Sequence, residues 1–175
     1  MANTTFDGPV RSKNGFINIG PGMTKPLTAD TNLTVQDHAG RILLLNDADG
    51  KFTLPAINTN ADSAVAGPGS DPNNLNNIGA SFYFFFETAA NDVDIKTTGA
   101  GNLFTGAILI GVNDGSKKAF VPNGSSNDVM TFDGGTAGGL AGSVVQVTAV
   151  DTNNYLVHNS LVIATGTIVT PFANA

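Results

Sequence analysis

Side chains that could perform chemistry are few in this chain, and histidine is among the scarcest. His38 and His158 are the two histidines among 175 residues. A zinc site usually needs more nitrogen or sulfur ligands, and the chain has no cysteine, although a mixed histidine and aspartate site stays open. Asp37 precedes His38, but no serine lies in a nucleophile elbow that the pair could activate. We therefore interpret Asp37 and His38 as turn residues and His158 as a structural residue of a strand.

The acidic residues also lack the spacing of a known site. The run at 47–50 resembles part of a calcium loop, but aligning Gly50 with the invariant glycine of that loop places Leu45 and Ala56 at ligand positions. We therefore interpret this run as a hairpin turn. Acid–base cleavage of sugars usually involves glutamate, and Glu87 is the single glutamate. We predict no catalytic, cofactor-binding or metal-binding residues and no enzymatic activity.

The composition narrows the choice of partners. Charged residues make up 13% of the chain, about half of the usual share of roughly 25%. The net charge is −6 and the pI is near 4.5, which argues against nucleic acid or an anionic membrane as a partner. No apolar stretch approaches the roughly 20 residues of a membrane span, and the N-terminus lacks the apolar region of a signal peptide. Without cysteine, stability must come from packing or from subunit association.

Short apolar runs recur from Asn32 onward, and glycine, proline, asparagine and aspartate separate them. The predicted strands lie at 32–36, 41–45, 51–54, 81–88, 92–97, 104–112, 119–121, 129–132, 144–150 and 155–157, with one or two more within 161–172. Turns at 37–40 and 47–50 predict two hairpins and a meander, and a turn at 151–154 predicts a third hairpin. The expected fold class is all-β: an antiparallel β-sandwich or barrel, jelly-roll-like, with an extended N-terminal arm.

Several segments of the predicted domain have a composition of their own. The continuous apolar run at 41–45 is typical of a fully buried strand. The aromatic run at 82–86 predicts a strand that is covered on both sides, or that another subunit partly covers. Residues 56–77 form a long surface loop by their composition. The glycine-dense stretch at 134–142 predicts a tight, closely packed corner.

The first thirty residues are interpreted as an arm, which precedes a β-rich domain at 31–175. The arm lacks sustained periodicity, but it carries scattered apolar and basic side chains that suit binding to a neighbouring molecule. The alternative is that residues 1–30 supply an N-terminal strand to the protein's own sheet. The predicted partner-binding residues are Phe6, Val10, Arg11, Lys13, Phe16 and Ile17 of the arm, together with Phe84 and Phe86 of the aromatic strand.

The order of these motifs resembles the small virion proteins of tailed bacteriophages, in particular capsid decoration, or cement, proteins of marine and cyanobacterial phages. The matching stretches are 37–55 with its Leu54-Pro55 ending, Gly79 with 82–86, 93–99, Phe104-Thr105-Gly106, 127–142, and 155–157 through Gly166 to 171–173. Residues 6–12 are similar to the starts of many marine-phage structural proteins. The likeness covers most of 31–175, with a longer loop at 56–77 and with Tyr155 where a tryptophan is common.

This resemblance implies a structural protein on the outside of the capsid, without catalytic residues. The expected partners are the major capsid protein and further copies of the chain, as a homotrimer. The expected location is the virion surface after synthesis in the host cytoplasm. The alternative is a head- or tail-fibre component or a module that binds glycans on the host surface. Such a module usually stacks sugars on exposed tryptophan or tyrosine, and this chain has no tryptophan and two tyrosines.

Overall fold

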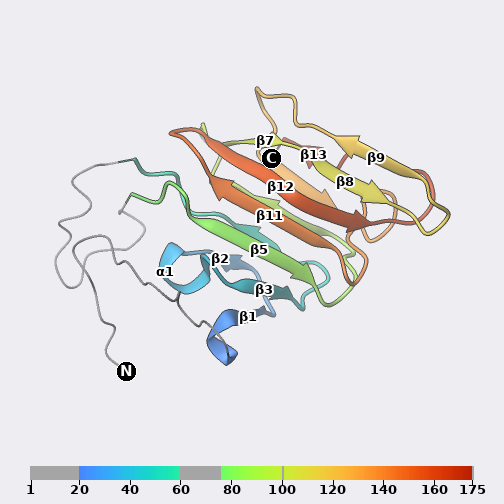
Figure 1. Cartoon of the computed structure of the whole chain (residues 1–175), viewed down its shortest axis with the longest axis horizontal. Helices are drawn as coiled ribbons and strands as arrows, with labels where there is room; N and C mark the ends of the chain where they lie inside the picture. Colours follow the sequence, from blue (N-terminus) through green and yellow to red (C-terminus); the bar gives the residue numbers. More distant parts are fainter. Residues whose placement is uncertain (1–19, 60–75, 100, 175) are drawn as a thin grey trace, which may run out of the picture.

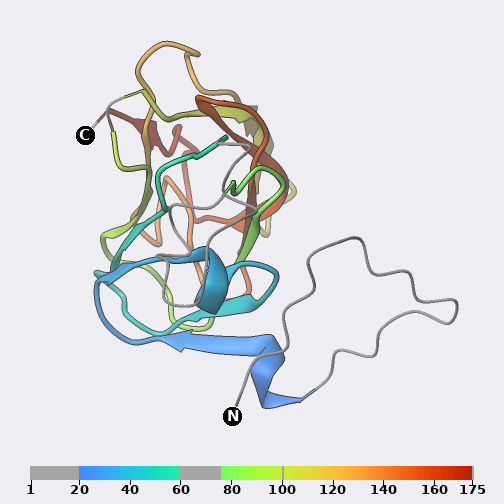
Figure 2. The ribbon, with the colours of Figure 1, turned by 90° about the vertical axis from the view of Figure 1, so that its left-hand side faces the viewer.

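A computed structural model describes residues 20–59, 76–99 and 101–174, and these residues form two packed β-sheets (Figure 1). The large sheet has the strand order β1 (Thr24–Leu27), β3 (Ile42–Leu45), β5 (Ser81–Phe86), β11 (Val144–Ala149), β12 (Asn154–Ile163), β8 (Ile108–Gly111) and β9 (Lys117–Phe120), and β7 (Leu103–Gly106) also pairs with β12. The small sheet has the order β13 (Phe172–Ala173), β10 (Val129–Phe132), β6 (Val93–Lys96), β4 (Lys51–Thr53) and β2 (Thr31–Asn32). Figure 2 shows the two layers from the side, with the large sheet toward the right. The predicted all-β sandwich is confirmed.

The core lies between the two layers because alternate residues of each strand point inward. In β5, Phe82, Phe84 and Phe86 are each at most 1% exposed. The ring of Phe86 meets that of Phe132 from the small sheet edge to face, with centroids 5.2 Å apart. Tyr155 of β12 is fully buried, and its hydroxyl donates a hydrogen bond to the carbonyl oxygen of Pro55 at 2.7 Å. Desolvation by this burial raises the pKa of Tyr155 above its ordinary value.

Strand pairing is mixed, which corrects the antiparallel, jelly-roll-like pairing predicted from the sequence. β1, β3 and β5 are parallel to one another, as are β2, β4 and β6, and β12 is parallel to both β7 and β8. The predicted meander is therefore wrong, because the turn at Asp47–Gly50 carries the chain from β3 in the large sheet to β4 in the small sheet. A chain that changes layer at each turn brings successive strands of one sheet into the same direction.

Other local predictions have mixed outcomes. The predicted strand at 32–36 is wrong beyond Asn32, because a short helix, α1 (Val35–His38), follows a Thr34 cap whose hydroxyl accepts from the backbone N–H of Asp37. The hairpin of β11 and β12 is confirmed, and the Asp151 carboxylate accepts from the backbone N–H groups of Asn153 and Asn154 in its turn.

The predicted glycine corner at 134–142 is confirmed as closely packed. A Cβ on Gly134 would meet the carbonyl oxygen of Ala90, and a Cβ on Gly138 would meet the side chain of Val162. The Asp133 carboxylate holds the corner by accepting from the backbone N–H groups of Gly135 and Ala137, each at 2.8 Å.

The boundary predicted for the N-terminal arm is corrected in part. Residues 24–27 form β1, which pairs with β3, so for these residues the alternative of a strand in the protein's own sheet is confirmed. A short 3₁₀ helix, η1 (Pro21–Met23), precedes that strand. Residues 1–19 lie outside the described residues, and so does most of the predicted loop at 56–77, namely 60–75.

Candidate functional site

The outward face of the large sheet carries a continuous row of apolar side chains. The strand register aligns one such residue from each of seven strands, and we call this row the apolar stripe: Pro26, Leu44, Phe85, Val144, Leu161, Leu109 and Ala119. Among them Val144 is 36% exposed, Leu109 is 40% exposed and Leu161 is 53% exposed. Isolated exposed apolar residues are normal on a protein surface, but a row across a whole sheet is a contiguous patch.

A β-bulge in β12 places Leu161 in this row. Tyr155 and Val157 point inward, so strict alternation would also turn residue 161 inward. Asn159 instead adopts a positive φ of 46°, and the pairing of β12 with β11 shifts by one residue between His158 and Leu161. The Asn159 side chain donates to Oε1 of Gln146 at 3.0 Å, which holds the bulge. Leu161 therefore faces outward, beside Val144 and Leu109.

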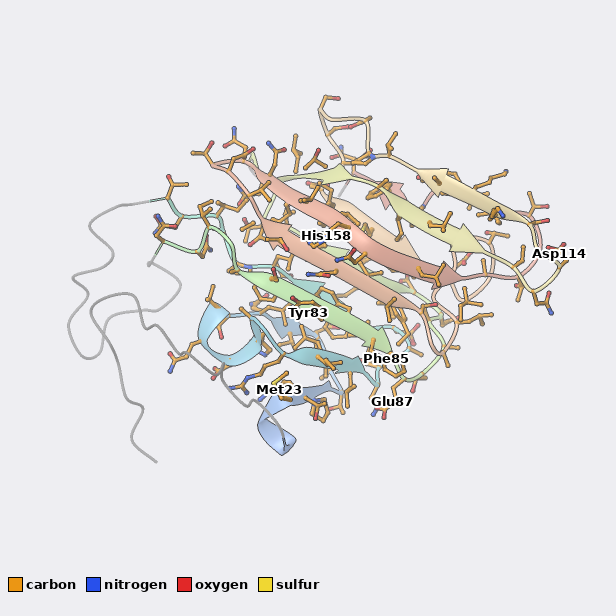
Figure 3. The ribbon with its side chains drawn as sticks, viewed as in Figure 1. Met23, Tyr83, Phe85, Glu87, Asp114 and His158 are labelled. Atoms are coloured by element: carbon orange, nitrogen blue, oxygen red, sulfur yellow. The ribbon has the colours of Figure 1, made fainter. Side chains whose placement is uncertain are left out.

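A second register row beside the stripe combines apolar and polar side chains: Ile42, Tyr83, Gln146 and His158. Figure 3 shows Tyr83, Phe85 and His158 on the face turned toward the viewer. His158 Nε2 and the Thr148 hydroxyl lie 2.8 Å apart, and the Thr148 hydroxyl lies 2.7 Å from that of Ser81. His158 thus has a hydrogen-bonding partner, Thr148, on the neighbouring register row, which supports the interpretation of His158 as a structural residue.

An open hollow of about 500 Å³ adjoins Tyr83 at the start of β5. Residues of α1 and of the segment before β5 line it, including Val35, Ala39, Asn76 and Ile78. Tyr83 is 39% exposed and Ile78 is 40% exposed. The hollow therefore extends the uncharged surface of the face beyond the strands.

The large sheet is uncharged over most of its outward face. Its described strands contain no acidic residue, and their basic residues are Lys25, Lys117 and Lys118. Lys25 is in register with Leu43 and Lys118 with Ile110, so both share the inward side, whereas Lys117 lies outward at the far edge. In a chain with a net charge of −6, such a face suits contact with another apolar surface.

The two edges of the large sheet carry features that oppose strand addition. The edge strand β1 contains Pro26, which has no backbone N–H to donate to a further strand. The opposite edge strand, β9, begins with Lys117 and Lys118, and lysine on an edge disfavours pairing with another chain. Association through the face is therefore favoured over association through the edges.

The predicted partner-binding residues divide into two groups, two in the core and six outside the described residues. Phe84 and Phe86 are 1% and 0% exposed in the core, so their prediction as partner-binding residues is wrong. Tyr83 and Phe85 are the outward side chains of the same strand, because tyrosine takes the side where its hydroxyl meets water. The remaining six, Phe6, Val10, Arg11, Lys13, Phe16 and Ile17, lie outside the described residues.

The other side chains considered for chemistry have structural partners. His38 is 6% exposed, and its Nδ1 accepts from the Thr34 backbone N–H at 3.0 Å. Desolvation by burial is the largest effect on the pKa of His38 and lowers it. The Lys51 ammonium pairs with Asp92 at 2.8 Å and Asp94 at 3.1 Å.

No group of three or more metal-ligating side chains occurs within 20–59, 76–99 and 101–174. In the same ranges no helix is long and apolar enough to cross a membrane.

Comparisons of this chain with known protein families, curated proteins and solved structures returned no match. The stripe, the bulge and the edge residues are therefore the observations on which a functional proposal must rest.

Proposed function

We propose that this chain is a non-enzymatic structural protein of a tailed-phage virion, which binds the outer surface of the major capsid shell and stabilises it. The observation that carries the proposal is the apolar stripe across the large sheet. Six spacings of about 4.8 Å make this face about 29 Å wide, and a strand height of about 15 Å gives an area on the order of 400 Å². This area is that of the whole outward face, which the stripe crosses, and exposed apolar patches of a few hundred Å² often bind other proteins.

One such face is a modest interface by itself. Covering it would remove roughly 800 to 900 Å² from water on both partners together, which is below the roughly 1,200 Å² of a stable specific complex. Residues Phe6, Val10, Arg11, Lys13, Phe16 and Ile17 of the N-terminal arm would add apolar area and positive charge to the contact. A homotrimer would add avidity, because three weak contacts held together dissociate more slowly than one. The homotrimer stays a prediction that sedimentation of the purified protein tests.

The motif order described above supports the capsid as the partner, since it resembles decoration proteins of phage heads. Imaging by electron microscopy tests this directly: particles of the phage that encodes the chain are labelled with an antibody against it. The proposal expects label spread over the head. Label confined to a tail or fibre would contradict it.

A glycan-binding module in a fibre is the second candidate, and one observation favours it. Tyr83 lies exposed beside the open hollow, where polar Asn76 and Ser81 also line the wall. An aromatic ring beside hydrogen-bonding groups is the arrangement that sugars use. Binding of the purified protein to host-surface glycans, lost on Tyr83→Ala, would favour this candidate over capsid decoration.

A further inference from the structure

The apolar stripe has no cover among the described residues, although an exposed face of this kind invites aggregation. A second copy packed face to face would bury roughly 800 to 900 Å² in total, less than a stable dimer needs. A segment of the same chain can supply a smaller cover, and residues 1–19 immediately precede the start of this sheet in the sequence.

The described chain begins at the margin of this same face. Gly20 precedes η1, which leads directly into β1, the edge strand of the large sheet. In Figure 2 the outward face of the large sheet is turned to the right, and η1 lies at the right-hand end of β1. The short helix η1, with which the described chain begins, thus lies on the side of the molecule where the stripe lies.

The segment is long enough to cross the sheet. Nineteen residues at about 3.3 Å each extend over about 60 Å, about twice the 29 Å width of the face. Leu161 lies four strand spacings, or about 19 Å, from β1, which six extended residues can cover. Residues 6–17 can therefore reach every strand of the stripe with slack.

The composition of residues 1–19 is complementary to the face. Its large apolar side chains after Met1 are Phe6, Val10, Phe16, Ile17 and Ile19, with small, polar and charged residues between most of them. Arg11 and Lys13 oppose one acidic residue, Asp7, so the segment is positive in an acidic chain. Glu87 lies beside Phe85 at the end of β5, where it supplies an exposed carboxylate at the rim of the stripe (Figure 3).

We propose that in the free protein residues 1–19 lie across the apolar stripe of their own molecule. A tethered segment acts at an effective concentration in the millimolar range, so it competes well against a second copy at micromolar concentration. The proposal stands on the isolated protein. Its consequence rests on the proposed function: a capsid subunit that binds the stripe must displace the segment, which frees Arg11 and Phe16 to contact the shell.

The absence of native cysteine allows a direct test by thiol protection. Leu161→Cys places one thiol on the stripe, and the matched control Val169→Cys places one on a surface residue away from the stripe. Leu161 is 53% exposed and Val169 is 44% exposed in the described structure. Alkylation by iodoacetamide is measured for both variants, in the full chain and in a chain that lacks residues 2–18.

The expected result is that the Leu161→Cys thiol reacts at least tenfold more slowly in the full chain than in the truncated chain, independently of protein concentration. The control thiol should react equally in both chains. Phe16→Ser with Ile17→Ser should remove most of the protection without truncation. Leu109→Cys repeats the measurement at a second stripe position if the first variant fails to fold.

Equal reaction rates in the full and truncated chains would overturn the proposal. So would protection that persists in the truncated chain and disappears on dilution, since that result assigns the stripe to a second copy. Because no capsid is present, a negative result here leaves the imaging test of capsid decoration unaffected, and a negative imaging result leaves this test unaffected.

Discussion

Two adjacent phenylalanines of β5 allow a sharp test of which side of the strand faces the core. Phe84 is 1% exposed and is in register with Leu43 and Val145, which are themselves buried. Phe85 is in register with Leu44 and Val144 of the stripe and is only partly buried. Truncation to alanine removes the same atoms from each, so the difference in effect reports on their surroundings.

Phe84→Ala should lower the free energy of unfolding by about 3–5 kcal/mol, since it removes a fully buried ring and leaves a cavity. Phe85→Ala should cost about 1 kcal/mol, because its ring keeps only lateral contacts and no cavity forms. Urea unfolding followed by circular dichroism measures both values, provided that the slope against denaturant is unchanged. Equal costs, or a larger cost for Phe85→Ala, would refute the assignment of inward and outward faces. In the chain that lacks residues 2–18, the cost of Phe85→Ala should shrink, since the proposed cover is gone.

Three further predictions concern the scaffold. Gly134→Ala should destabilise the protein by more than the control Gly166→Ala, whose cost should be about 1 kcal/mol. Both glycines have a positive φ, but only at Gly134 would the added Cβ meet the Ala90 carbonyl oxygen. Thermal unfolding of the two variants compares their stabilities. Burial raises the pKa of Asp133, but the hydrogen bonds from the surrounding N–H and hydroxyl groups together lower it by more. The pKa of this carboxyl therefore lies below its ordinary value. The folded-state pKa is therefore below the unfolded one, and the contribution of this carboxylate is full above about pH 4 and is lost as the pH falls through the folded-state value. Asp133→Asn should reduce this acid sensitivity in unfolding experiments between pH 2 and 6, and an unchanged profile would contradict the prediction. Deletion of residues 2–18 should leave the β-sheet circular dichroism spectrum intact, because both sheets begin after Gly20, whereas a loss of folded signal would show that the segment belongs to the core.

Much of the strand content followed from the sequence because alternation reports directly on a half-buried strand. The predicted strand at 92–97 is present as β6, where the alternate residues Val93 and Ile95 are buried, and the Asp151 turn joins β11 to β12 as expected. The turn at Asp47–Gly50 was misread because an Asp/Gly turn signals a change of direction but not which sheet the next strand enters. Mixed pairing depends on long-range contacts between layers, which short-range patterns do not encode.

The candidate site was only partly accessible from the sequence. The aromatic run drew attention to β5, but it does not show whether the odd- or the even-numbered residues face outward. Phe84 and Phe86 proved to be inward side chains. The position of Tyr83 was the available signal, since tyrosine prefers the side that meets water. Leu161 could not be identified as an outward residue from alternation, because the bulge at Asn159 exchanges the inward and outward positions along the rest of β12.

The most direct test of the central claim measures binding of purified protein to capsids that lack it. Leu161→Asp places a charge in the apolar stripe, and Val169→Asp places the same charge at an exposed apolar position away from it. Both variants should fold, since both side chains are exposed. The proposal predicts that Leu161→Asp weakens capsid binding at least tenfold in a cosedimentation assay, about 1.4 kcal/mol or more, while Val169→Asp binds like the unmodified protein. Undiminished binding of Leu161→Asp would contradict capsid attachment through the outward face of the large sheet.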